Sequence, residues 1–228
     1  MKEAIISAAG TIGPVTIGGS LIGGAVNQSG SITARDGLGQ VTIGGSIRGG
    51  GGVTSGAIAC TQDVAGVTVG GSLIGGSGAS SGVIFSAQGA TGPAKIGGNI
   101  LGGTAPFSGR IFGKTKLGSV TVGGSFVGGS ASDSGRIHSE GNIGPVSIGH
   151  DVVGGTSLHS GFIEGAGTIG ALNIGGSLIG GQGDGSGSIE ILGDTGAVKI
   201  RHECRAVRAL RPQVSPSKNY LPLPSAAR

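Results

Sequence analysis

Five side chains that could do chemistry recur at two positions of a repeated pattern in the second half of the chain. Glu164 and Glu190 hold the same position in consecutive copies, and each directly follows an isoleucine. His138 holds this position one copy earlier, and Arg110 and Arg136 stand two residues ahead of that position in their own copies. Two carboxylates about 5 Å apart can act as acid and nucleophile in retaining glycoside hydrolysis. Glu164 and Glu190 are therefore the candidate catalytic residues. The alternative, a solvated face of mixed charge, is the interpretation we favour.

Metal and cofactor sites have weaker support. The segment "IGHDVVGG" places His150 and Asp151 where other copies have a second glycine and a serine, and His159 follows nearby. Two histidines and one aspartate at irregular spacing do not form a metal signature, so we expect corner residues that face water and no cofactor. Cys60 and Cys204 lie in unrelated contexts, which favours neither a disulfide nor a metal pair.

A repeat accounts for the spacing of these residues. Successive copies begin at Val15, Val41, Val67, Ala94, Val120, Val146, Leu172 and Val198. The position number rises by 26 from one copy to the next, and by 27 once, between Val67 and Ala94. Within a copy, the first and third positions are apolar and the second is polar, as in "VTI", which is the alternation of a short β-strand. "SLI" and "SGSI" mark two further extended pieces. The 55 glycines of the chain argue against helical repeats.

Three short strands per copy, none able to bury its apolar face alone, predict a stacked architecture. We expect an all-β fold over residues 1–200, a parallel β-solenoid of about 7–8 coils with about 26 residues in each coil. The general handedness of parallel crossovers favours a right-handed β-helix. The chain starts in the middle of a coil, because Ile6 aligns with Ile32.

Glycine pairs and serines recur at fixed places in each copy. Pairs such as Gly18-Gly19 are predicted to form corners that need a positive φ or a close backbone approach. A serine before a glycine is predicted to bond its own turn or the serine of the next coil, as a structural ladder. The serines of this column are Ser29, Ser55, Ser81, Ser108, Ser134, Ser160 and Ser186.

The last segment of the chain, 201–228, contains no glycine and carries the basic charge of the chain. It holds six Lys and Arg against one Glu, whereas residues 1–200 hold nine against ten acidic residues. We expect a non-repetitive tail that is a cap, with a short helix in "ECRAVRAL", or is disordered, or results from a change of reading frame or a truncation. Since the solenoid has no basic stripe and no Trp, we expect no nucleic-acid partner. No apolar run is long enough for a membrane span.

The recurrence of "VTIGGSLIGG" and "SGSI" over about residues 1–200 resembles bacterial Gly-rich repetitive β-helix proteins, which include autotransporter passengers and large adhesins. This resemblance implies a non-enzymatic structural or adhesive segment of a secreted or cell-surface protein, with a surface glycan or protein as partner. "MKEAIISAAG" is too short and mixed for a signal peptide. Two alternatives remain: a carbohydrate-active β-helix enzyme that uses Glu164 and Glu190, and a polymerising scaffold of the bactofilin kind that associates end to end.

Overall fold

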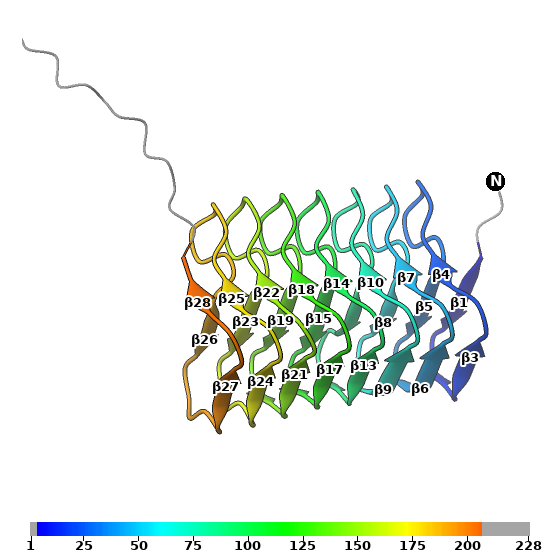
Figure 1. The fold of residues 1–228 in the computed structure, drawn as a ribbon. Coiled ribbons are helices and arrows are strands. Elements are labelled where there is room, and N and C mark those ends of the chain that lie inside the picture. The colour runs from blue at the N-terminus through cyan, green and yellow to red at the C-terminus, as the bar shows by residue number, and fades with distance from the viewer. Residues whose placement is uncertain (1–3, 207–228) are drawn as a thin grey trace, which may run out of the picture.

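The chain forms a rod of stacked parallel strands. A computed structural model describes residues 4–206, and within this range it contains strands and turns but no helix. The chain makes about eight turns, one for each copy of the repeat, and every turn lies directly on the one before it (Figure 1). The predicted β-solenoid is confirmed.

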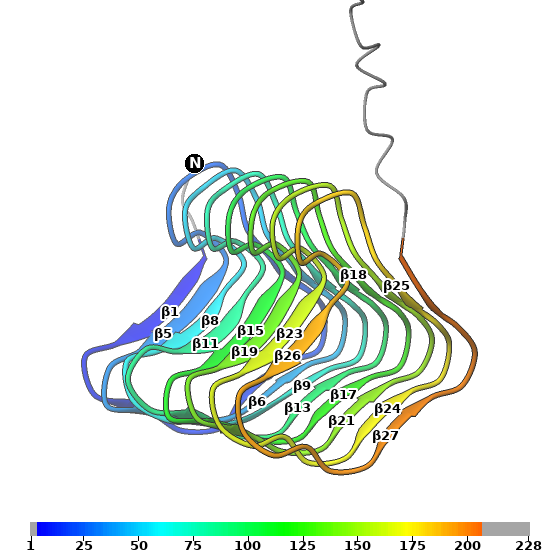
Figure 2. The ribbon, with the colours of Figure 1, turned by 90° about the vertical axis from the view of Figure 1, so that its left-hand side faces the viewer.

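Three parallel sheets run along the rod, and each turn adds to all three (Figure 2). Sheet A consists of β1 (Ile5–Ala8), β5 (Ser31–Ala34), β8 (Ile58–Cys60), β11 (Ile84–Ser86), β15 (Arg110–Gly113), β19 (Arg136–Ser139), β23 (Phe162–Gly165) and β26 (Ile189–Ile191). Sheet B consists of β2 (Thr11–Ile12), β3 (Val15–Ile17), β6 (Gly37–Ile43), β9 (Val64–Val69), β12 (Ala90–Thr91), β13 (Ala94–Ile96), β16 (Lys116–Leu117), β17 (Val120–Val122), β20 (Asn142–Ile143), β21 (Val146–Ile148), β24 (Leu172–Ile174) and β27 (Val198–Ile200). Sheet C consists of β4 (Leu21–Ile22), β7 (Ile47–Arg48), β10 (Leu73–Ile74), β14 (Ile100–Leu101), β18 (Phe126–Val127), β22 (Val152–Val153), β25 (Leu178–Ile179) and β28 (Cys204–Arg205).

Sheet B is more complex than the sequence suggests. In most turns a second short piece, such as Thr11–Ile12 or Lys116–Leu117, precedes the expected strand. The register nevertheless follows the repeat, since Val67 pairs with Ala94 across the single longer interval. The additional residue of the longer copy lies in the connection between β11 and β12. Before this connection, Ile84 pairs with the residue 26 positions earlier, Ile58. After it, Thr91 pairs with the residue 27 positions earlier, Val64.

The core is a stack of similar apolar layers, one from each turn. The inward isoleucines of sheet A have no exposed surface in six successive turns: Ile32, Ile58, Ile84, Ile111, Ile137 and Ile163. Ile43, Ile96 and Ile148 of sheet B and Phe126 of sheet C fill the same interior. Every layer therefore completes the core of its neighbours, as the repeat predicts.

The corner glycines serve a purpose that differs in part from the prediction. The Gly-Gly corners need close approach rather than a positive φ: a Cβ on Gly44 would lie 2.2 Å from the carbonyl oxygen of Gly18 in the preceding coil. Positive φ occurs instead at the glycine that follows the serine column. At Gly109, for example, φ is +68° and a Cβ would lie 2.4 Å from the carbonyl oxygen of Leu101, so that only glycine fits there.

The solenoid continues beyond the expected boundary at Ile200. β28 pairs with β25 in the register of the repeat, Leu178 with Cys204 and Ile179 with Arg205. The segment assigned to the start of a short helix thus includes a strand. The rest of the tail, residues 207–228, lies outside the described residues.

Candidate functional site

One part of the surface brings three phenylalanines together with histidine, arginine and acidic side chains. It lies on the outer side of sheet A, next to the loops that join sheet C to sheet A and project from the rod (Figure 2). We call this surface the A-face cluster. Its residues are Phe107, Arg110, Phe112, Asp133, Arg136, His138, His159, Phe162 and Glu164.

Strand alternation and register bring these side chains together. Ile111 and Ile137 point into the core, so the residues on either side of them point outward. The parallel register then stacks Arg110 on Arg136 and Phe112 on His138. Phe162 and Glu164 continue the two columns in the next coil.

Arg136 is neutralised by two carboxylates. Its Nη1 atom lies 2.7 Å from Oδ1 of Asp133, and its Nη2 atom contacts Oε2 of Glu164. The Phe162 ring lies beneath the guanidinium, with its centroid 5.7 Å from Cζ. The arginine side chain is only 12% exposed, and burial lowers its pKa while Asp133 opposes that effect.

Arg110 has aromatic neighbours in place of carboxylates. Its Cζ atom lies 5.0 Å from the ring centroids of both Phe107 and Phe112. Among the described residues it forms no ion pair, and its buried Nε makes no hydrogen bond. Burial, and to a lesser extent the charge of Arg136, lowers the pKa of Arg110 to about 10, so the group remains charged at neutral pH.

His138 is a neutral side chain within this network. Its ring meets Phe112 edge-on, with centroids 5.2 Å apart, and its Nδ1 atom lies 3.4 Å from Oε2 of Glu164. Burial, followed by the charges of Arg136 and Arg110, lowers the pKa of His138 to about 3. Because Arg136 already compensates the carboxylate, Glu164 does not hold the imidazole in its charged form.

The two candidate catalytic carboxylates occupy adjacent coils but different surroundings. Glu164 and Glu190 are register partners in β23 and β26. Glu164 is held by Arg136, which favours its ionised form, whereas Glu190 is exposed. A general acid needs a carboxyl group that stays protonated until it reacts, and the ion pair of Glu164 does not provide that environment.

Sequence reasoning found the charged columns but missed the aromatic residues and loop positions that complete the cluster. Phe107, Asp133 and His159 occupy one loop column, and the His159 ring stacks on Phe162 with centroids 4.8 Å apart. The available signal was the distribution of phenylalanine. The chain has five, and all except the core residue Phe126 lie on or beside this face.

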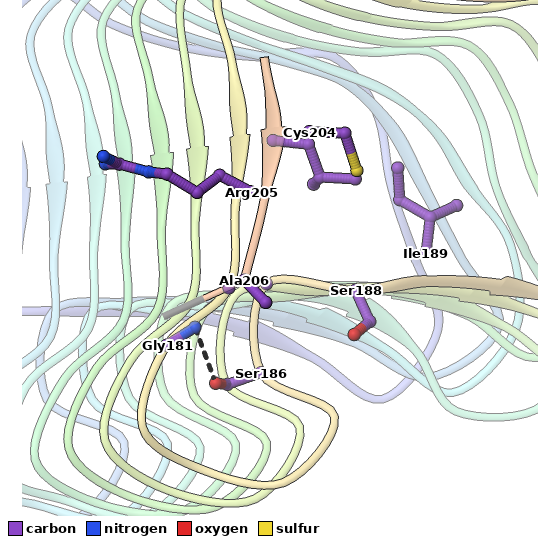
Figure 3. Close-up of a pocket in the computed structure, with 10 residues that line it drawn as sticks. Gly181, Ser186, Ser188, Ile189, Cys204, Arg205 and Ala206 are labelled. Carbon is purple, nitrogen blue, oxygen red and sulfur yellow. Dashed lines mark hydrogen bonds between the residues drawn. The ribbon is translucent and has the colours of Figure 1, made fainter. Parts of the chain in front are cut away.

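Three cavities lie at the two ends of the described rod, and none of these three is lined by Glu164 or Glu190. One of about 370 Å³, shown in Figure 3, is bordered by the last loop and by Cys204, Arg205 and Ala206. Because it adjoins the last described residue, we assign it no ligand.

The serine column closes loops within single coils. Each hydroxyl oxygen accepts the N–H of a glycine five positions earlier at 2.7–3.1 Å. Figure 3 shows this bond between Ser186 and Gly181. Five of the seven hydroxyls also donate to the carbonyl three positions earlier, as Ser134 does to Ala131. Of the two predicted arrangements, the structure has the bond to the serine's own turn.

The ladder between coils lies at a different column, which the repeat pattern alone did not indicate. The residue after each corner, which is Gly-Gly in every coil but one and Gly149-His150 in that one, accepts through its side chain the backbone N–H of its counterpart in the next coil at 2.7–3.4 Å. The accepting residues are Ser20, Ser46, Ser72, Asn99, Ser125, Asp151 and Ser177. Asp151 is thus a member of this corner ladder.

Other candidate sites are isolated. Within residues 4–206, no group of three or more His, Cys, Asp or Glu side chains could hold a metal ion. His150 is an exposed corner residue, and His159 belongs to the A-face cluster. Cys60 is buried, Cys204 is exposed, and both are free thiols. In the described part of the chain, nothing qualifies as a membrane-crossing helix.

Comparison with protein-family models, curated proteins and solved structures gives no match for this chain.

Proposed function

We propose that the chain is a non-enzymatic structural and adhesive repeat segment of a secreted or cell-surface protein. The observation that supports this function best is that one set of positions in the repeat builds the rod and a different set forms the A-face cluster. Core isoleucines, close-packed glycines and the corner ladder build the rod in every coil. The A-face cluster uses positions that vary from coil to coil, and it places a cation and aromatic rings beside an exposed loop.

Binding requires only that these side chains offer contact area and hydrogen-bond donors to a partner. Catalysis would also require a carboxyl group that is protonated until it reacts. Arginine and aromatic side chains dominate recognition surfaces, because they combine a large contact area with directional donors. The A-face cluster offers both on a rigid sheet. A partner that is either a glycan or a protein on another surface fits this arrangement.

The test is a binding screen of the purified chain against arrays of glycans and extracellular proteins. The combined variant Phe107→Ala with Arg110→Gln is expected to lose the binding that the wild-type chain shows. The matched control is Arg48→Gln with Thr121→Ala, which changes exposed residues of sheets C and B. Equal loss in both variants, or loss in neither, would contradict an adhesive role for this face.

Incubation with polysaccharides tests the enzyme hypothesis. We expect no new reducing ends. If reducing ends formed with the wild-type chain and were abolished by Glu164→Gln or Glu190→Gln, the proposed function would be wrong. Protease treatment of intact cells of the source organism tests the proposed location, since a surface protein is cleaved while cytoplasmic proteins stay intact.

A further inference from the structure

Two arginines lie side by side on the outer surface of sheet A, but only one of them has its charge matched. Arg110 and Arg136 are register partners in β15 and β19. Arg136 is compensated by Asp133 and Glu164, whereas Arg110 has no ion pair among the described residues. A partly buried guanidinium without a counterion is a site at which an external anion gains a strong, charge-assisted interaction.

The packing of Arg110 prepares it for such an anion. The rings of Phe107 and Phe112 each lie 5.0 Å from its Cζ atom and restrict where the guanidinium can point. Arginine is weakly hydrated, and its donors form a planar fork that matches the two oxygens of a carboxylate. A side chain already held by its neighbours loses less entropy when it binds.

The surrounding charges select the anion. The positive charges of Arg110 and Arg136 are balanced by the negative charges of Asp133 and Glu164, so the four groups together are neutral. The one negative charge of a carboxylate matches the one guanidinium that has no ion pair, whereas the second charge of a dianion such as phosphate would lose hydration without meeting another unmatched cation. This balance favours a monoanionic ligand.

The rim of the site favours a sugar over a peptide. Phe107 is 37% exposed at a loop beside the guanidinium, so it offers an apolar surface against which the C–H face of a sugar ring can pack. Ligand sites of this kind combine an aromatic surface with a few placed polar groups. Two coils further along the loop column that contains Phe107, His159 adds a second ring, in a side chain that is 39% exposed, for a later residue of an extended polymer.

We propose that Arg110 anchors a carboxylate-binding site whose ligand is a hexuronate residue of an acidic polysaccharide. Phe107 packs against the sugar ring, and Arg110 binds its carboxylate. This inference rests on the proposed adhesive function and names the chemical class of the ligand. An acidic peptide is the competing source of the same carboxylate.

Calorimetry with a glucuronate-containing tetrasaccharide tests the site. The wild-type chain is expected to bind it, and the methyl-esterified tetrasaccharide, which lacks the charge, is expected to bind at least about tenfold more weakly. Arg110→Gln should cause a similar loss, Arg110→Lys an intermediate one, and the control Arg48→Gln none. Circular dichroism confirms that each variant is folded. Equal binding of the acid and its ester, or unchanged affinity of Arg110→Gln, would overturn the proposal.

A second measurement does not depend on a variant. Titration of the wild-type chain with the tetrasaccharide should shift the Nε–Hε resonance of Arg110 in an NMR spectrum and leave that of Arg48 in place. Binding of a poly-glutamate peptide but not of the tetrasaccharide would overturn the sugar ligand. If the A-face cluster bound a neutral partner and Arg110→Gln had no effect, the adhesive function would stand and the carboxylate site would fall.

Discussion

The side chain of Asp151 accepts the backbone N–H of Ser177, one coil further along the rod, with its Oδ1 atom 2.7 Å from the amide nitrogen. In the coil before, the hydroxyl of Ser125 accepts the N–H of Asp151 at 3.4 Å. This aspartate stands out in the sequence as a candidate metal ligand. In the structure it accepts the backbone N–H of the next coil, as the serines and the asparagine of the corner ladder do.

Two substitutions of Asp151 should distinguish the effect of its hydrogen bond on stability from the effect of its charge. Asp151→Ala removes the acceptor of the Ser177 N–H and is expected to lower the free energy of unfolding by about 1–2 kcal/mol. Asp151→Ser restores the acceptor used in most other coils and should differ from wild type by less than about 0.5 kcal/mol. Urea denaturation measures both. His150→Ser is the control at a neighbouring exposed position. Equal losses for Ala and Ser at residue 151 would refute the ladder role.

The buried serines are expected to be intolerant of alanine. Ser134 has no exposed surface, and its hydroxyl accepts the N–H of Gly129 at 3.1 Å and donates to the carbonyl of Ala131 at 2.6 Å. Ser134→Ala leaves both groups without that partner, which should lower the free energy of unfolding by about 1–3 kcal/mol. Ser130→Ala, at an exposed loop position, should change it by less than about 0.5 kcal/mol. Thermal denaturation followed by circular dichroism compares the two, and similar melting temperatures would argue against the loop bond.

The sequence was sufficient to predict the solenoid, because residues that recur at a fixed interval lie on one another in successive coils. Columns of isoleucine at a fixed interval can be buried only if the copies lie on one another. The register of Arg110, Arg136 and His138 followed from the same interval. Their loop partners did not, since a loop residue such as Asp133 reaches Arg136 through the path of its own loop, which no periodic pattern specifies.

The physical role of each glycine also could not be predicted from the sequence. Glycine can be required for its torsion angles or for its lack of a side chain, and composition does not distinguish these reasons. The structure assigns close packing to Gly44 and a positive φ to Gly109. Likewise, two serine columns with similar sequences make different bonds, because one lies inside a loop and the other lies where two coils meet.

The loop position just before the buried serine carries backbone strain that a single substitution should relieve. Thr54 has a φ of 55°, in the left-handed region that β-branched residues avoid. The seventh coil has Gly185 at this position, with a φ of 63°. Thr54→Gly is expected to raise the free energy of unfolding by up to about 1 kcal/mol, because the relieved strain of about 1–2 kcal/mol exceeds the entropy cost of glycine. Urea denaturation measures this change.

The matched control is a threonine with extended backbone. Thr121 lies in the middle of β17 with its side chain exposed. Thr121→Gly should lower the free energy of unfolding by about 0.5–1 kcal/mol, since it adds chain entropy and relieves no strain. Destabilisation by Thr54→Gly of the same size would show that the left-handed conformation carries no strain there.

His138 should make the rod less stable in mild acid. Its pKa is lowered to about 3 by burial and by Arg136 and Arg110, whereas the unfolded chain titrates near 6.5. Between these values the unfolded state binds a proton that the folded state does not, so stability falls as the pH falls through this window. At about pH 5 the loss is on the order of 1–2 kcal/mol relative to about pH 7.

His138→Gln removes this titration and should flatten that part of the pH profile in urea denaturation, whereas His150→Gln, at an exposed corner, should leave it as in wild type. Identical profiles for wild type and His138→Gln would mean that His138 is not held neutral in the folded rod.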